Sequence, residues 1–292
     1  GLSRSNKGIN PIFPTYGAEF SLVGKFTLPY SMFNGVDYAT LGDQKEYKYI
    51  YTGDSYTGDN GIRVNNGDYL ESIPSTTNPT PNSVVNYQDA AADPAKVDQK
   101  KYNWLEYYKI KFKADWYTRV AGTAKSPLVL RSLVEFGFLG AYNQERGVVP
   151  FERFYLGGDG MANYSMDGRE TIALRGYPNS SLTPINKAGE PIGATIYNKY
   201  SLELRYPITL KASASIYALT FLEAGSSFDT FKNYNPFALS RSAGAGLRVY
   251  MPAFGLLGID FGYGFDGLPL PNGTLGSTPN GWETHFIIGQ QF

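Results

Sequence analysis

The chain has 292 residues, and its 26 Lys and Arg balance its 26 Asp and Glu, so the formal net charge at pH 7 is zero. This balance argues against a non-specific nucleic-acid binder, which needs a basic surplus. The absence of cysteine excludes disulfides, thiolate catalysis and cysteine-bound metal. The one histidine, His285, excludes a multi-histidine metal site, and we expect no cofactor.

The composition is rich in residues that build β-structure and turns, with 24 Tyr, 18 Phe and 33 Gly. No apolar run approaches the ~18 residues of a membrane helix. This combination is typical of two classes, secreted β-rich adhesins and outer-membrane β-barrels.

Alternation with period 2 predicts eight strands and no helix. In residues 196–208, for example, Leu202 and Leu204 share one face, while Glu203 and Arg205 share the other. The predicted strands are residues 19–28, 104–120, 128–138, 196–208, 216–224, 242–251, 256–265 and 282–292.

Fully charged side chains on the polar faces leave two readings. A soluble sandwich would place the charged face in water and the apolar face in a core. A barrel in lipid inverts this, with the apolar face against acyl chains and the charged face against a wet interior.

The connections between the predicted strands favour the barrel. Short and long links alternate strictly, as in an up-and-down membrane barrel with short periplasmic turns and long outer loops. The short links are 121–127, 209–215 and 252–255, and the long ones are 31–103, 141–194, 226–241 and 266–281. Because 31–103 is too long for a bare loop, we interpret it as an extracellular insertion that is partly ordered or binds a partner.

The link 141–194 carries the most specific motif. Pro150-Phe151-Glu152-Arg153-Phe154-Tyr155-Leu156-Gly157-Gly158 is followed by Leu174-Arg175-Gly176-Tyr177. This pattern resembles the sixth surface loop of the BamA family of outer-membrane protein assembly factors, in which F-Y-x-G-G precedes R-G-[FY] and the loop folds into the barrel lumen. The resemblance extends over most of the chain except 31–103, which together with Tyr177 suggests a divergent, Bacteroidetes-type member.

By resemblance, Arg175 is a latch whose acceptors are Glu203 and Glu223. Independent chemistry agrees, because a guanidinium fork binds carboxylates, and both Glu residues are predicted to point inward from neighbouring strands. The alternative is that Arg175 caps a turn at the surface.

The neighbours of Arg175 complete the predicted latch. We expect Gly176 to let the loop backbone approach the barrel wall closely, and Tyr177 to pack on interior aromatics such as Phe221. Leu174 belongs to the same four-residue motif.

The last predicted strand would form the barrel seam. A terminal aromatic on an alternating strand is a sorting signal of outer-membrane barrels. Gly289 would weaken the seam, so that it can open laterally and accept an incoming strand. The predicted seam residues are Trp282, Phe286, Ile288, Gly289 and Phe292.

Other chemistry receives less support. His285 is interpreted as a lumen-facing polar residue, because no Ser/Asp constellation accompanies it. Glu135, Glu203 and Glu223 could suggest paired carboxylates for hydrolysis, but inward charged networks in barrels are usually structural. We therefore expect no enzyme.

Together these features predict the last eight strands of a sixteen-stranded transmembrane barrel, with POTRA domains upstream of residues 1–292. The resemblance implies an insertase of the bacterial outer membrane whose partners are machinery lipoproteins, unfolded outer-membrane proteins and lipid. The alternatives are a two-partner-secretion type exporter and a passive small barrel or porin.

Overall fold

The computed structural model describes residues 1–292 except 9, 59, 76–77, 82–83, 124–125, 162–168, 212, 253–254, 271–273 and 290–292. The chain divides into two compact units. Unit 1 contains residues 1–26, 108–140 and 150–292, and unit 2 contains residues 27–107 and 141–149.

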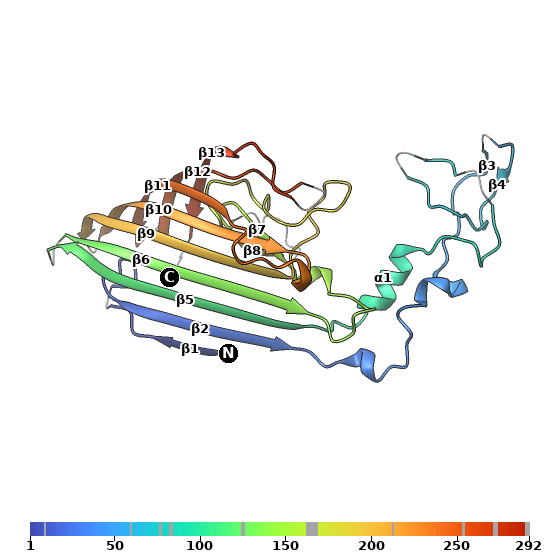
Figure 1. The fold of residues 1–292 in the computed structure, drawn as a ribbon, viewed down its shortest axis with the longest axis horizontal. Helices are drawn as coiled ribbons and strands as arrows, with labels where there is room; N and C mark the ends of the chain where they lie inside the picture. The colour runs from blue at the N-terminus through green and yellow to red at the C-terminus, as the bar shows by residue number, and fades with distance from the viewer. Residues whose placement is uncertain are drawn as a thin grey trace. The chain divides into compact units, whose positions relative to one another are not determined.

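Unit 1 is built on one antiparallel sheet of nine strands, in which each strand pairs with its neighbours in chain order (Figure 1). The predicted all-β class and up-and-down topology are therefore confirmed. The strands are β1 (Leu2–Ser5), β2 (Gly17–Phe26), β5 (Tyr108–Gly122), β6 (Pro127–Gly140), β9 (Ile196–Lys211), β10 (Ala214–Phe228), β11 (Ser240–Met251), β12 (Gly255–Gly264) and β13 (Gly281–Ile288).

One strand escaped prediction. β1 pairs with β2 over four residues, from Leu2 opposite Leu22 to Ser5 opposite Glu19. Its sequence, Leu-Ser-Arg-Ser, is too short to show a period and contains one apolar residue. The second predicted strand also began too early, because Trp104 lies in unit 2 and β5 starts at Tyr108.

The alternation of link lengths follows the prediction. Within the sheet, β5–β6, β9–β10 and β11–β12 are joined by short turns, whereas 27–107, 141–195, 229–239 and 265–280 form the long links. All long links leave from one end of the sheet, since consecutive strands run in opposite directions.

The sheet is inverted relative to a soluble protein. On β9, the side chains of Leu202 and Leu204 are 45% and 38% exposed, while Glu203 and Arg205 are 4% and 7% exposed. Charged residues therefore line the concave side and apolar residues the outer side. A wet interior and a lipid-facing exterior account for this pattern, whereas a soluble sandwich does not.

An apolar cluster fills the concave side near the short turns. Phe13, from the link between β1 and β2, is 1% exposed and packs edge-on against Tyr217 with ring centroids 5.3 Å apart. Tyr117, Val129 and Phe221 belong to the same cluster. Burial of these large side chains holds the β1–β2 link inside the curved sheet.

Unit 2 contains the one α-helix of the described residues, α1 (Pro94–Tyr102), where no helix was predicted. None of its residues is buried, so it shows no apolar stripe. The start signals are nevertheless present: Asp93 accepts hydrogen bonds from the backbone of Ala95 and Lys96, and Pro94 occupies the first turn. No helix among the described residues is long and apolar enough to cross a membrane.

Short elements and one buried ion pair make up the rest of unit 2. The carboxylate of Glu106 binds the backbone and hydroxyl of Ser31 and lies 3.5 Å from the guanidinium of Arg146. Because 141–149 supplies Arg146 to this unit, the link after β6 contributes to unit 2 before it turns inward. The other elements are η1 (Tyr30–Met32), η2 (Leu41–Asp43), η3 (Lys45–Tyr47), β3 (Tyr56–Thr57) and β4 (Arg63–Val64).

The inverted sheet can be tested with one charge on each side. Leu204→Arg would bring a guanidinium to the lipid side at the middle of β9, and we expect it to lower the free energy of unfolding in bilayers by ~2–4 kcal/mol. The side chain of Ser21 borders the concave cavity, so Ser21→Arg should lower the free energy of unfolding much less. Denaturant titration in lipid vesicles measures both, and equal losses would contradict the assignment of the faces.

Candidate functional site

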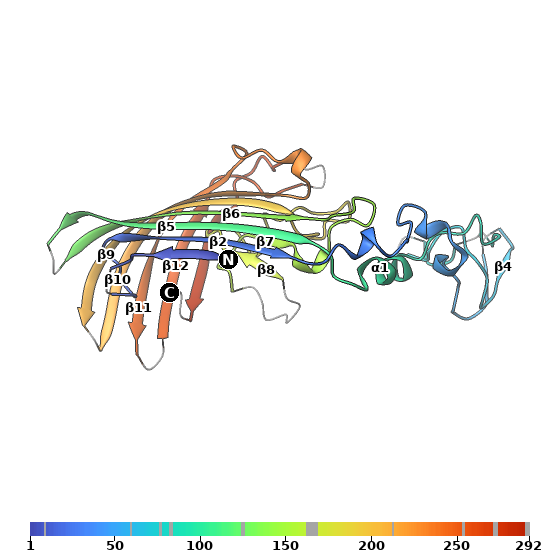
Figure 2. The same ribbon diagram turned by 90° about the horizontal axis from the view of Figure 1, so that it is seen from below.

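The loop between β6 and β9 folds over the concave side of the sheet (Figures 1 and 2). It contains η4 (Pro150–Glu152) and the parallel pair β7 (Phe154–Leu156) and β8 (Glu170–Ile172). Phe154 is fully buried and packs against Tyr197 of β9 with ring centroids 4.7 Å apart. Residues 154–156 of the loop therefore belong to the interior.

Arg175 binds three carboxylates at the centre of this interior. Its Nη2 donates to Glu223 Oε1 at 2.6 Å and to Glu203 Oε1 at 2.7 Å, and its Nη1 donates to Asp260 Oδ2 at 3.1 Å. Its Nε and backbone N–H also donate to Glu223, at 3.1 and 2.8 Å. The structure thus brings together Arg175, Glu203 and Glu223 and adds an acceptor that was not predicted.

The ion pairs of Arg175 are buried, which strengthens the attraction between the guanidinium and the carboxylates. Arg175 is 6% exposed, and its guanidinium carbon lies 3.8 Å from the centroid of the Phe221 ring. Burial alone would lower the pKa of Arg175, but the carboxylates of Glu223, Glu203 and Asp260 raise it instead. The guanidinium therefore stays charged, and its planar fork meets carboxylates from three different strands.

The carboxylates are shared with further arginines. Glu203 also accepts from Arg205 Nε at 2.8 Å and from Arg131 Nη1 at 3.4 Å. Asp260 accepts from Arg248 at 2.6 and 2.7 Å. The network therefore links β6, β9, β10, β11 and β12 through the loop. Asp260 went unnoticed because its strand reads as Gly-rich and apolar, and only the register between β11 and β12 sets it opposite the loop.

Gly176 lies directly against the wall. Its φ is +87°, and a Cβ there would come within 2.9 Å of Ser242 Cβ. The facing residue of the wall is also a glycine, Gly262, where a Cβ would lie 2.7 Å from the Gly176 nitrogen. The predicted close approach is therefore present, and it requires glycine on both partners.

Two residues near the C-terminus hold the Gly176 backbone. His285 Nε2 accepts from the Gly176 N–H at 2.9 Å, and Asn280 Nδ2 donates to its carbonyl at 3.0 Å. His285 is thus a lumen-facing polar residue, as expected, and it also binds the loop, which sequence reasoning missed. An accepting Nε2 carries no proton, so the proton of neutral His285 lies on Nδ1.

Tyr177 anchors the end of the motif. It is fully buried, its hydroxyl donates to the Arg241 carbonyl at 2.7 Å, and it accepts from the Asp266 N–H at 3.2 Å. Burial raises the pKa of Tyr177 to about 12, so it remains a neutral donor. Leu174 is also fully buried, and its backbone exchanges two hydrogen bonds with the backbone of Gly158 after β7.

A second attachment lies nearer the long links. Glu170 of β8 forms ion pairs with Lys109 and Lys111 of β5, both at 2.7 Å, and Lys109 also binds Glu152 at 3.1 Å. Burial by itself would raise the pKa of Glu170, but the two ammonium groups outweigh it and lower the pKa. The loop is therefore attached to the wall through Glu152 and Glu170 as well as through Arg175.

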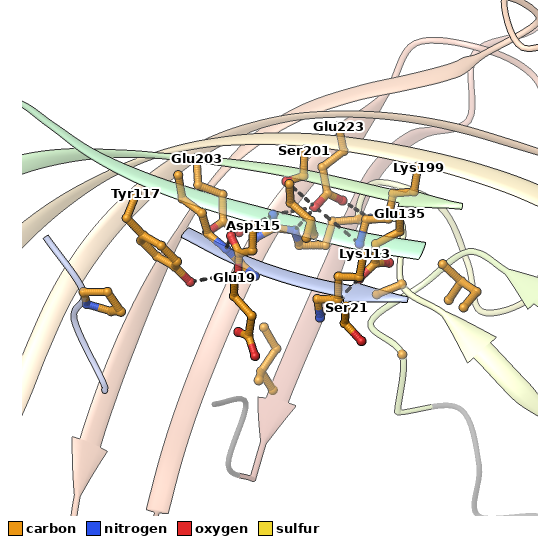
Figure 3. Close-up of a pocket in the computed structure, with 18 of the residues that line it drawn as sticks. Glu19, Ser21, Lys113, Asp115, Tyr117, Glu135, Lys199, Ser201, Glu203 and Glu223 are labelled. Atoms are coloured by element: carbon orange, nitrogen blue, oxygen red, sulfur yellow. Dashed lines mark hydrogen bonds and ion pairs between the residues drawn. The ribbon is translucent and has the colours of Figure 1, made fainter. Parts of the chain in front are cut away.

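Between the attachments lies a polar cavity of about 600 Å³. Figure 3 shows side chains from β2, β5, β6, β9 and β10 pointing into it, with both charge signs represented. Lys113 and Glu135 lie 3.3 Å apart there, and Asp115 pairs with Arg131 at 2.9 Å. Glu135 therefore stands apart from the carboxylates that bind Arg175.

The predicted seam residues lie on β13. Trp282, Phe286 and Ile288 face outward and are exposed, whereas His285 faces the interior. β13 ends at Ile288, and Gly289 has a φ of +128°. Phe292 lies outside the described residues.

The family follows from a domain match. The Omp85 superfamily domain matches residues 15–292. The chain belongs to the Omp85 superfamily. No curated protein sequence matches this Omp85 chain. Among solved structures, it is similar to BamA from Haemophilus ducreyi lacking POTRA domains 1–3, with 16% identity and a TM-score of 0.48. The match covers 97% of this chain and 40% of that one.

Replacing Arg175 should release the loop. Arg175→Ala leaves three buried carboxylates without their shared partner, a change that costs roughly 3–5 kcal/mol for a buried ion pair. Arg175→Lys should also destabilise, because one ammonium cannot reproduce the planar fork. Limited proteolysis of residues 183–193 and the melting temperature report the loss. Arg4→Ala on the exposed β1 is the control, and unchanged loop protection in Arg175→Ala would contradict the assignment.

The second attachment should depend on pH. The pKa of Glu170 is lower in the folded protein than the ordinary value of 4.5, so its stabilising effect is fully present above that value. It disappears as the pH falls through the lowered folded pKa. Wild type should therefore melt above Glu170→Gln at neutral pH, and the difference should vanish in acid. Glu190→Gln, on an exposed turn of the same loop, should show no such difference at any pH.

Proposed function

We propose that this Omp85 chain is the C-terminal part of an insertase that folds β-barrel proteins into the bacterial outer membrane. Membership of the superfamily supports a role in barrel assembly or translocation. The observation that carries the finer proposal is the Arg175 network, because it fixes the interior loop to the strands that precede the sheet edge.

The latch would make one part of the barrel rigid. Arg175 binds β9, β10 and β12, and Gly176 binds His285 of β13. These contacts hold the last strands in one register through side chains as well as through their ladders. A rigid wall next to an unpaired strand is the geometry that a template for incoming strands requires.

The far edge of β13 would be that template. In the described part of the chain, β13 pairs with β12 alone. It has eight residues against sixteen in β9, and Gly289 interrupts its extended conformation. An incoming strand could add there through backbone hydrogen bonds, which need no particular side chains. No covalent chemistry is involved.

The short β13 also favours local thinning of the membrane. A transmembrane strand needs about 9–11 residues, and the described part of β13 has eight, so we propose that lipid beside it adjusts to a lower hydrophobic wall. Thinner lipid lowers the barrier for a new strand to enter from the side. The mechanism therefore combines edge pairing with a weakened bilayer.

The proposal also concerns parts of the protein outside these 292 residues. The chain spans 40% of the length of the BamA structure it matches. We propose that seven further strands join the nine of this sheet in a sixteen-stranded barrel and that POTRA domains precede it. The long links would be extracellular and the short turns periplasmic, with machinery lipoproteins and unfolded barrel proteins as partners.

Reconstitution of the full protein in liposomes tests the function. With an unfolded outer-membrane barrel protein as substrate, the wild type should yield a protease-resistant, heat-modifiable product. Arg175→Ala should fall close to the rate of empty liposomes, and Arg4→Ala should match the wild type.

The alternatives predict different products. An exporter would move a protease-protected substrate into the vesicle lumen without folding it into the bilayer. A passive barrel would do neither and would tolerate Arg175→Ala. Either result would overturn the insertase proposal.

A further inference from the structure

The link between β10 and β11 folds over the outer side of the sheet. Residues 229–239 contain η5 (Phe231–Asn233), and Figure 2 shows this orange segment on the opposite side of the sheet from β7 and β8. The preceding long link of unit 1, the Arg175 loop between β6 and β9, turns to the inner side of the sheet. The two links therefore cover opposite faces of the same sheet.

Ring contacts fix the position of the segment. Phe231 packs edge-on against Phe138 of β6 with centroids 5.9 Å apart, and Tyr234 packs against Phe136 at 6.3 Å. Glu135 of β6 lines the interior cavity. Because successive strand residues point to opposite sides, Phe136 and Phe138 point outward. The segment thus reaches two strands across the exterior, from β10 over β9 to β6.

The segment is apolar where it is most exposed. Phe231 is 66% exposed even though it stacks on Tyr234, and Phe237 is 88% exposed. Lys232 lies between them and is also exposed. Large exposed aromatics on a soluble surface are unfavourable, so this pattern points to a non-aqueous or interfacial surrounding.

We propose that residues 229–239 are a membrane-interface anchor, with Phe231 and Phe237 embedded among lipid headgroups and upper acyl chains. The segment is continuous with the outer side of β6, which the apolar alternation of the barrel assigns to lipid. Transmembrane β-barrels carry girdles of aromatic residues at this depth, on both sides of their apolar band. Lys232 suits the same depth, since its ammonium can reach anionic headgroups.

The anchor would act on the strands it spans. It crosses the outer side of β9 while Arg175 holds the inner side of the same strand. The bilayer would thereby fix the outer end of β10 and β11 from outside the barrel. The alternative occupant of this surface is a partner protein, and the experiment below is done without one.

Single cysteines can map the surrounding of the segment. The 292 residues contain no cysteine, so Phe231→Cys and Phe237→Cys can be labelled with the fluorophore NBD, after replacement of any cysteine elsewhere in the protein. The labelled full-length protein is placed in nanodiscs of phosphatidylethanolamine and phosphatidylglycerol. Leu222→Cys, on the outer side of β10, is the lipid-facing reference, and Ala188→Cys, on an exposed turn of the Arg175 loop, is the aqueous reference.

We expect headgroup-proximal nitroxide lipids to quench the label at 231 and 237, and iodide to quench it several-fold less than at 188. The emission should also shift to shorter wavelength relative to the label at 188. Efficient iodide quenching at 231, with no quenching by lipid, would overturn the inference. Should Phe231→Cys fail to fold, the label at 237 decides by the same criteria.

The reference at 222 separates this inference from the proposed function. If the label at 222 is lipid-quenched and that at 231 is not, the anchor is wrong and the barrel assignment is unaffected. If the label at 222 is itself accessible to iodide, the lipid-facing side of the sheet is misassigned, and both proposals fall.

Discussion

A single buried guanidinium organises the interior of this chain. Arg175 comes from a loop, yet its partners are on three strands, so its charge can be satisfied only when the loop and those strands adopt one arrangement. A buried charge without partners is strongly unfavourable. The network therefore favours one docked state over the many in which the loop is merely inside the barrel.

The arrangement of side chains in unit 1 separates the Arg175 network from the outer side of the sheet. Leucines and aromatics cover most of the outer side, and the buried ion pairs of Glu203, Glu223 and Asp260 lie in the interior. At the short-turn end, Phe13 packs with Tyr117 and Tyr217, and the guanidinium of Arg205 lies over the rings of both tyrosines. The aromatic cluster and the charged network of the interior are therefore in direct contact.

The sequence was informative wherever period-2 alternation was long. β9 could be placed from its residues, and Glu203 and Glu223 could be given an inward direction without any structure. The resemblance then paired them with Arg175. Asp260 and His285 could not be paired in this way, because their contacts depend on strand register and on the path of a loop more than 80 residues away in the chain.

Helix α1 and strand β1 were missed for a shared reason. Both are short and lack an apolar face of their own, so the pattern that reveals amphipathic elements is absent. In α1 the cap residues Asp93 and Pro94 carried the signal. In β1, pairing with β2 supplies the hydrogen bonds that decide its conformation.

The glycines of β12 give the docked loop a further consequence. Gly262 and Gly264 face the interior opposite the Gly176 backbone and the Tyr177 ring, and a side chain at either would collide with the loop. Strand residues alternate sides, so a slip of one position would turn the glycines to lipid and present Phe261 or Tyr263 to the loop instead. The loop can dock only on a correctly registered wall. Docking of the Arg175 loop therefore serves as an internal check on whether the protein's own last strands have assembled in register.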